Sequence, residues 1–246
     1  MDEEKLVTIT TVSFNSAKTI SKTIESVLNQ TYPFIEYIIK DGMSTDETIQ
    51  IAHSYKDEFI KKGYIFKVVS LPDEGMYDAL NQAIEMSSGF IVGNVNSDDF
   101  FEKNAVEAIV NEYLKKPYDM IYASLRIING SKVKVKKAKF KKFVSSRYWN
   151  HPTTFIRREV LLEEKYANKT LYDDFDLMIR IRKKYNVRIC DEVLSNFVFG
   201  GMSTKKTFKE TVKRIKIKNS IYRKNGYKNP LYFIDTYIIE FLKYLF

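Results

Sequence analysis

Hydrophobic and polar positions in the first half of the chain follow two periodicities by turns. Short β-branched and apolar runs, typical of buried strands, alternate with segments whose apolar residues recur every three or four positions, as on one helix face. The predicted strands are residues 6–14, 35–39, 64–70 and 90–95. The predicted helices are one capped by Asn15 or Ser16, one from Thr45 to about residue 62, one from Gly75 to before Gly89 and one at 104–117. This alternation predicts an α/β fold with a mostly parallel sheet and helices on both faces.

The pattern changes after Met120. Two strand-like runs flank an Asn129-Gly130 pair, which predicts a hairpin with a tight turn. The remaining predicted elements are a short strand at 151–155, helices at 159–166 and 174–184, a strand at 188–199, a loop at 200–201 and a helical tail from about Lys205.

Polar clusters follow each of the four predicted strands in the first half. In parallel sheets ligands bind at the carboxyl ends of the strands, so we expect these clusters to converge on one site. They are Asn15-Ser16, Asp41-Gly42, residues 73–75 and Asp98-Asp99.

Cysteine content and hydropathy narrow the class of protein. The single cysteine, Cys190, allows no intramolecular disulfide and suits a reducing compartment. The first eleven residues lack a basic leader followed by an apolar stretch, and no uncharged apolar run of about eighteen residues occurs. We therefore expect neither a secretory signal nor a spanning helix.

The formal charge of +9 is unevenly distributed. Residues 1–130 carry a net charge of −8, residues 131–147 hold eight basic and no acidic side chains, and residues 205–246 hold eleven basic and three acidic ones. Nucleic-acid binders and proteins that dock on anionic lipid both show such basic segments. The acidic front half argues against nucleic acid.

Asp98 and Asp99 form an acidic pair at the end of the fourth strand. Adjacent carboxylates repel one another unless a cation or hydrogen bonds offset the repulsion. Their oxygens suit Mg²⁺ or Mn²⁺, which would bridge the phosphates of a departing nucleoside diphosphate. The alternative is capping of the helix that starts near Asn104. Considered alone, Asp41 and Asp78 likewise fit turns and helix caps.

Asp173, Asp174 and Asp176 stand at the start of a predicted helix. The helix dipole favours acids there, so one interpretation is structural. The other is a general base, since a carboxylate beside an acceptor hydroxyl can take its proton as the new bond forms. His151, one of two histidines, is either a hydrogen-bonded structural residue or a contact to phosphate or acceptor.

Taken together and in order, these segments resemble family 2 of the inverting glycosyltransferases. The resemblance covers about residues 6–200, and one segment resembles a subgroup active in bacterial surface-polysaccharide assembly. It rests on TITTVSFN, TIESVLNQTYPFIEYIIKDGMSTDET, LPDEGMYDALNQAI (the subgroup segment), GFIVGNVNSDD, HPTTFIRREVL and YDDFDLMIRI.

The resemblance implies a GT-A fold and inverting transfer of a hexosyl or N-acetylhexosaminyl group from a nucleotide sugar, preferably UDP-linked, to a saccharide hydroxyl. It implies a domain at 1–204, with a nucleotide-binding half at 1–117 and an acceptor half at 118–204, and a helical tail at 205–246. The implied roles are nucleotide contacts for Ser13, Asn15, Asp41, Asp78 and Asp98, metal contacts for Asp98 and Asp99, the general base for Asp174 or Asp173, and an acceptor or phosphate contact for His151.

Two positions depart from the family pattern. Asn96 stands where many relatives carry an acid, so the full D-x-D is absent and the main metal ligand is either Asp98 or Asp99. Lys40 stands where relatives often carry another acid, which changes the contacts to the base. The position relative to residues 175–177 favours Asp174 as the general base.

The C-terminal tail is basic and aromatic. Residues 230–246 are too short and too charged to span a bilayer, so they predict an interfacial helix or a helix packed on the main domain or on a second subunit. An interfacial helix would suit a polyprenyl-diphosphate-linked acceptor, which lies in the membrane. We expect a cytoplasmic protein, peripheral on the inner face of the cell membrane, with a homodimer as the alternative use of the tail.

Two further classes compete with the transferase. A nucleotidyltransferase acting on sugar phosphates shares a nucleotide-binding sheet, but a glycine- and basic-rich loop would follow its first strand, where this chain has FNSAKT. A nucleic-acid-binding protein would gather basic and aromatic residues on one face. We expect no nucleic-acid partner.

Overall fold

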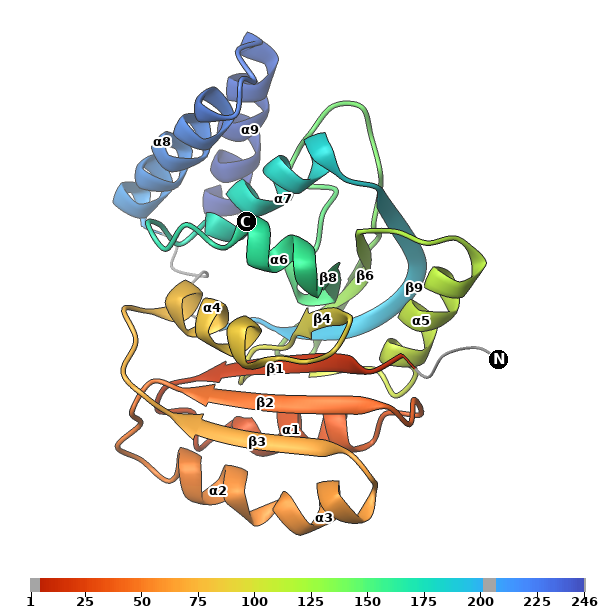
Figure 1. Cartoon of the computed structure of the whole chain (residues 1–246). Helices are drawn as coiled ribbons and strands as arrows, with labels where there is room; N and C mark the ends of the chain where they lie inside the picture. The colour runs from red at the N-terminus through yellow and green to blue at the C-terminus, as the bar shows by residue number, and fades with distance from the viewer. Residues whose placement is uncertain (1–4, 201–206, 246) are drawn as a thin grey trace.

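The computed structural model describes residues 5–200 and 207–245 (Figure 1). Over these residues a nine-stranded sheet runs in the order β3-β2-β1-β4-β8-β6-β9-β5, with β7 paired to β6. The first half contains β1 (Val7–Ser13), α1 (Ile20–Leu28), β2 (Ile35–Asp41), α2 (Thr48–Ser54), α3 (Lys56–Lys61), β3 (Ile65–Ser70), α4 (Met76–Met86), β4 (Ile91–Asn94), β5 (Phe100–Phe101) and α5 (Ala105–Lys115). The second half contains β6 (Met120–Asn129), β7 (Lys132–Lys136), a 3₁₀ turn (His151–Thr153), β8 (Thr154–Arg157), α6 (Arg158–Glu164), α7 (Asp173–Lys184), β9 (Val187–Val198), α8 (Phe208–Lys224) and α9 (Pro230–Leu245).

The parallel sheet predicted for the first half is confirmed. β1 lies between β2 and β4 and runs parallel to both, and β3 adds parallel to β2. Apolar residues of α1, α2, α3 and α5 fill one core, and those of α4, α6 and α7 fill a second. The helices therefore cover both faces of the sheet, which leaves the carboxyl ends of the strands open.

The second half makes the sheet mixed. β8 pairs antiparallel with both β4 and β6, and the long strand β9 runs parallel to β6. The two-residue strand β5, which the sequence pattern did not predict, pairs antiparallel with the far end of β9. This pairing ties the chain that follows Asp98-Asp99 to the second half of the chain.

Two predicted helix starts are wrong. The helix predicted from Thr45 to about residue 62 is two helices, α2 and α3, which meet at Tyr55. The backbone N–H of Thr48 is bound by Asp46 Oδ1 (3.0 Å). Asn15 does not cap α1, whose N-cap is Thr19, because its side-chain oxygen accepts a hydrogen bond from the Thr45 backbone N–H (2.9 Å).

The tail forms a pair of helices that pack on α7. The Phe175 and Tyr222 rings meet edge to face at 5.3 Å, and Asn225 Nδ2 donates to Asp176 Oδ1 (2.8 Å). The predicted loop residue Gly201 and the tail start at Lys205 lie outside the described residues. Within those residues, no helix is both long and apolar enough to cross a bilayer.

Candidate active site

Hydrogen bonds join the four strand ends. The Ser16 and Ser97 hydroxyls, after β1 and β4, lie 2.8 Å apart. The Asn15 backbone N–H donates to Ser44 Oγ (2.8 Å), which joins the ends of β1 and β2. Lys40 Nζ lies 2.9 Å from Asp73 Oδ2, which joins β2 to the loop after β3. The polar clusters therefore form one continuous rim.

Asp41 organises this rim from below. Its carboxylate has no exposed surface and accepts hydrogen bonds from the hydroxyls of Ser13 (3.0 Å), Ser44 (2.5 Å) and Ser70 (2.8 Å). The Ser44 backbone N–H donates to it as well (2.8 Å). Buried carboxylates are stable when donors surround them in this way. Asp41 therefore fixes three loops at the carboxyl ends of β1, β2 and β3.

Lys40, which departs from the family pattern, has a structural explanation. Its ammonium group is buried and binds the Asp73 carboxylate, the Asp41 carbonyl (2.9 Å) and the Leu71 carbonyl (2.7 Å). A Cβ on Gly42 would lie 2.8 Å from Asp73 Oδ2, so a larger residue at this position would displace the Asp73 carboxylate. Lys40 thus holds the Asp73 loop against the end of β2.

Asn15 and Asp78 shape the loops at the two sides of the rim. Asn15 is exposed and has a φ of 50°, a left-handed conformation that asparagine tolerates better than most residues. Asp78, in the first turn of α4, accepts from the Glu74 backbone N–H (3.1 Å) and from Gln82 Nε2 (2.9 Å). Both side chains therefore order the loops in which a nucleotide would lie.

The Asp98-Asp99 pair is divided between two environments. Asp99 is fully buried and accepts hydrogen bonds from the Val198 backbone N–H (2.9 Å) and from Asn96 Nδ2 (3.0 Å). Burial, together with the charge of Asp98, raises the pKa of Asp99 to about 7. Burial also raises the pKa of Asp98, which remains partly exposed. A nearby cation would lower both pKa values.

The donor set fits a divalent cation only in part. Among the described residues no group of three acidic, histidine or cysteine side chains is arranged so that it could hold a metal ion. Asp98 presents a carboxylate at the rim, and Asp99 lies directly behind it. A hard cation held by one carboxylate takes its remaining ligands from water and phosphate oxygens, as Mg²⁺ does in nucleotide sites.

Asp173 and Asp174 are divided in the same manner. Asp173 is buried and accepts from the backbone N–H groups of Lys169 (2.5 Å) and Thr170 (3.1 Å), and from the Thr170 hydroxyl (2.8 Å). Asp174 is partly exposed. Burial, and next the charge of Asp174, raise the pKa of the neighbouring Tyr77. Asp176 points elsewhere, toward Asn225 and Arg180.

Aromatic side chains surround Asp174. The Tyr77 and Tyr166 rings stack at 5.2 Å, and Tyr166 Oη lies 3.2 Å from His151 Nε2. Burial lowers the pKa of His151, whereas the charge of Asp174 opposes that shift. Trp149, the only tryptophan, meets His151 edge to face at 5.6 Å. The sequence pattern did not single out Tyr77 and Tyr166 as site residues, although Tyr77 stands inside the LPDEGMYDALNQAI segment.

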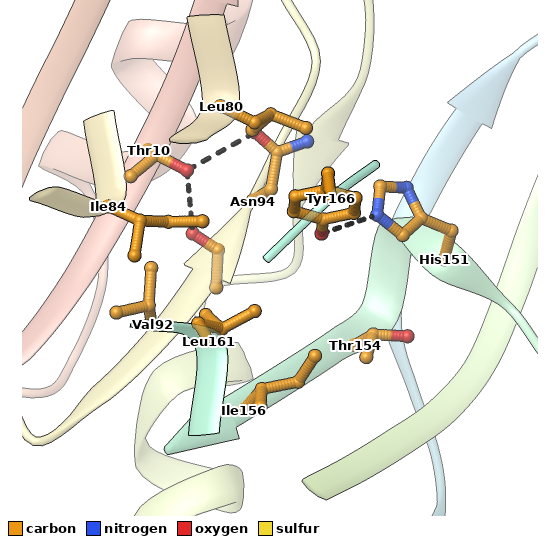
Figure 2. A pocket seen from close by; sticks show the side chains of 11 residues that line it. Thr10, Leu80, Ile84, Val92, Asn94, His151, Thr154, Ile156, Leu161 and Tyr166 are labelled. Atoms are coloured by element: carbon orange, nitrogen blue, oxygen red, sulfur yellow. Dashed lines mark hydrogen bonds between the residues drawn. The ribbon is translucent and has the colours of Figure 1, made fainter. Parts of the chain in front are cut away.

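Two cavities adjoin this cluster. The first cavity, about 10 Å³, lies beside His151 and Tyr166 and is lined by residues of β4 (Figure 2). This cavity has room for a water molecule at most. The second, about 320 Å³, lies between the start of α4, residues 168–172 and α8. Tyr77 and Tyr172 line it, together with Lys169, Lys213 and Arg214. Only the second cavity is large enough for part of a saccharide.

The chain is similar in sequence to known glycosyltransferases. The chain is 27% identical to a chondroitin synthase of Escherichia coli, over 97% of this chain and 36% of that one. It is 30% identical over 131 residues to the UDP-Glc:alpha-D-GlcNAc-diphosphoundecaprenol beta-1,3-glucosyltransferase WfgD of Escherichia coli, over 53% of this chain and 50% of WfgD. The chain thus spans between about a third and a half of these relatives' length.

Solved structures share the fold. S. aureus TarS in complex with UDP-GlcNAc superposes with a TM-score of 0.75 at 18% identity, over 98% of this chain and 72% of that one. The Pyrobaculum calidifontis mannosyltransferase PcManGT, in complex with GDP-Man and Mn²⁺, superposes with a TM-score of 0.66 at 16% identity, over 97% and 70%. The expected GT-A fold is confirmed. The model of the family "Glycosyl transferase family 2" matches residues 8–180, so the chain belongs to this glycosyltransferase family.

Proposed function

We propose that this glycosyltransferase moves a hexose or N-acetylhexosamine from UDP to a saccharide hydroxyl in cell-surface polysaccharide synthesis, with Asp174 as general base. The acceptor class includes a saccharide on polyprenyl diphosphate, as the name of WfgD states for that relative. The carrying observation is the position of Asp174, a partly exposed carboxylate among Tyr77, Tyr166 and His151, close to the 320 Å³ cavity.

The rim formed by the strand ends supports the donor assignment. Its Ser, Asn and backbone groups come from four loops that Asp41 and Lys40 hold together. A nucleotide needs such fixed donors and acceptors for its base, ribose and phosphates. Ser13 and Asn15 stand at the end of β1, and Asp78 orders the loop after β3. TarS, which has been solved with UDP-GlcNAc, shares this fold.

Asp98 is the better placed metal ligand of its pair. Asp99 already accepts two hydrogen bonds in a buried position, whereas no other described residue donates a hydrogen bond to the Asp98 carboxylate. A bound Mg²⁺ or Mn²⁺ would neutralise the diphosphate and make it a better leaving group. Asp99 then positions Asp98 by fixing the loop to β9.

The chemical step follows from the two sides of the site. Asp174 takes the proton of the acceptor hydroxyl, and the oxygen attacks the anomeric carbon from the face opposite the nucleoside diphosphate. The bond to the diphosphate breaks as the new glycosidic bond forms, which inverts the configuration. A general base of this kind contributes on the order of 10²–10⁴ in rate. Tyr77 and Tyr172 line the cavity in which an acceptor sugar can lie.

Calorimetry with UDP tests the donor side. We expect binding with Mn²⁺, weaker binding with EDTA, and loss of the metal effect in Asp98→Asn. Asp191→Asn, a change at an exposed acid on β9, is the matched control and should bind like the natural chain. Absence of UDP binding with and without metal would remove the donor assignment. A screen of UDP-sugars against Asp174→Asn then tests the base.

A further inference from the structure

The last helix, α9, buries two polar side chains, packs Tyr232 and Phe233 against the core, and exposes six large apolar side chains. Its inner face buries Thr236 and Glu240 completely or nearly so. Its outer face is apolar, and each of its large side chains is between 48% and 57% exposed: Leu231, Ile234, Tyr237, Ile238, Phe241 and Leu242. A helix on a water-facing domain normally shows the reverse arrangement. This outer face of α9 is therefore built for an apolar partner.

Both acidic side chains of α9 form hydrogen bonds and ion pairs with neighbouring residues. Arg214 Nε and Lys218 Nζ of α8 donate to the two Glu240 oxygens at 2.9 and 2.8 Å. The other acid of α9, Asp235, accepts from the Ser145 hydroxyl (2.7 Å) and pairs with Arg147. Ion pairs with basic neighbours thus neutralise both acids of α9, and its outer face carries no negative charge.

The fold brings the two basic segments of the sequence together at α9. The Phe143 ring stacks on Tyr232 at 4.6 Å, and the Tyr222 hydroxyl donates to the Val144 carbonyl (2.8 Å). On the other flank, the Arg223 guanidinium lies over the Phe233 ring at 5.0 Å. Residues 131–147 hold eight basic and no acidic side chains, and residues 207–245 hold nine basic and three acidic ones. Positive charge therefore flanks the outer face on both sides.

We propose that the outer face of α9, with its basic flanks, docks the protein on a bilayer containing anionic lipid. Apolar side chains of such a helix enter the boundary between headgroups and acyl chains, while lysine and arginine remain among the phosphates. A second copy of the chain fits less well, because a symmetric contact would bring the basic segments of both copies near each other. The docking does not depend on the proposed reaction.

Docking has a consequence for the acceptor. Lys213, Arg214 and Ile217 of α8 line the 320 Å³ cavity, so the helix that holds α9 also forms a wall beside Asp174 and Tyr77. If the proposed function holds, this arrangement presents the cavity to a saccharide anchored in the same membrane.

Vesicle sedimentation of the full chain tests the proposal. We expect binding to vesicles of phosphatidylglycerol and phosphatidylcholine, much weaker binding to phosphatidylcholine alone, and release by high salt. The variant Ile234→Ser/Ile238→Ser/Phe241→Ser should lower the partition coefficient at least about tenfold. Its control, Ile60→Ser/Ile65→Ser/Leu114→Ser, changes exposed apolar residues of the nucleotide-binding half and should bind within about twofold of the natural chain.

A charge variant separates the electrostatic contribution. Lys137→Gln/Lys139→Gln/Lys142→Gln should weaken binding to anionic vesicles, whereas Lys56→Gln/Lys61→Gln/Lys103→Gln, at other exposed lysines, should not. UDP binding and thermal unfolding should be unchanged in all four variants. Failure of the natural chain to bind anionic vesicles would overturn the proposal. A dimer in light scattering that the serine variant of α9 dissociates would instead identify a second copy as the partner.

Discussion

The acidic pair after β4 and the acidic pair that opens α7 share a design but differ in how far apart their supports lie. In each, one carboxylate is buried and accepts at least one hydrogen bond from a backbone N–H group, and the other is partly exposed at the site. Asp173 is held by Lys169 and Thr170, four and three residues away. Asp99 is held by Asn96, three residues away, and by Val198, ninety-nine residues away.

Asp173 therefore makes local hydrogen bonds at the start of α7, whereas Asp99 makes a hydrogen bond between distant parts of the chain. Asp173 orders the loop directly before α7, so its contribution is confined to one wall of the 320 Å³ cavity. Asp99 joins the loop after β4 to the end of β9, so its loss would loosen the contact between the first and second halves of the chain. In both pairs the exposed member, Asp174 or Asp98, is the one available for chemistry.

Asp174→Asn should give the largest effect. The amide keeps the shape of the side chain but cannot accept a proton, so kcat should fall by about 10³-fold or more. The thermal unfolding midpoint should stay within a degree or two of that of the natural chain, about what a surface change produces. Transfer rates with UDP-sugar and acceptor measure the first quantity and calorimetry the second. Undiminished turnover would remove Asp174 from the base role.

Asp98→Asn should have the second largest effect on activity. We expect roughly a 10²-fold loss in kcat/KM that added Mn²⁺ does not restore. Asp98 is partly exposed, so the fold should survive the change. Titration of activity against Mn²⁺ distinguishes a lost ligand from a lost fold. If the activity of Asp98→Asn depended on Mn²⁺ as that of the natural chain does, Asp99 would be the main metal ligand instead.

Asp173→Ala should act on stability rather than on the chemical step. It leaves two backbone N–H groups and the Thr170 hydroxyl without their acceptor, which costs about 2–3 kcal/mol. Urea denaturation measures this loss. Asp173→Asn, which can still accept a hydrogen bond, should recover part of it. Equal stability of the alanine variant and the natural chain would contradict the capping role.

The smallest effect concerns His151. Burial holds the folded pKa of His151 below its ordinary value of 6.5, and the charge of Asp174 opposes the shift. The stability contributed by neutral His151 is therefore complete above about pH 6.5 and falls as the pH drops through the folded pKa. In Asp174→Asn the pKa of His151 should fall further. NMR titration measures it, with exposed His53 as the second resonance. A rise of the His151 pKa in Asp174→Asn would contradict the placement of the Asp174 carboxylate near His151.

Local signals in the sequence were enough for most of the fold. The strand at Val7–Ser13, the helix N-cap at Asn104 and the Asn129-Gly130 turn follow from neighbouring residues, and the structure contains them. The wrong cap at Thr45 and the missed strand β5 depend on partners far along the chain. Asn15 binds Thr45, and β5 exists because β9 lies beside it.

The candidate site was less accessible from sequence for the same reason. Polar residues at strand ends predicted where a ligand would lie. Which acid of each pair is buried depends on donors such as the Val198 backbone N–H. The Tyr77–Tyr166 stack joins residues from α4 and the loop after α6. The outward apolar face of α9 follows from the ion pairs of Glu240 with α8, which no helical periodicity encodes.

The contact between Trp149 and His151 means that tryptophan fluorescence can report changes around His151. Trp149 is the only tryptophan in the chain, is nearly buried, and donates from Nε1 to Thr154 Oγ1 (2.9 Å). Its emission therefore originates from one place, one ring away from His151 and two from Tyr166. Under the proposed function, spectral changes on adding a saccharide would report acceptor binding without a label, which makes an acceptor screen feasible before any product can be assayed.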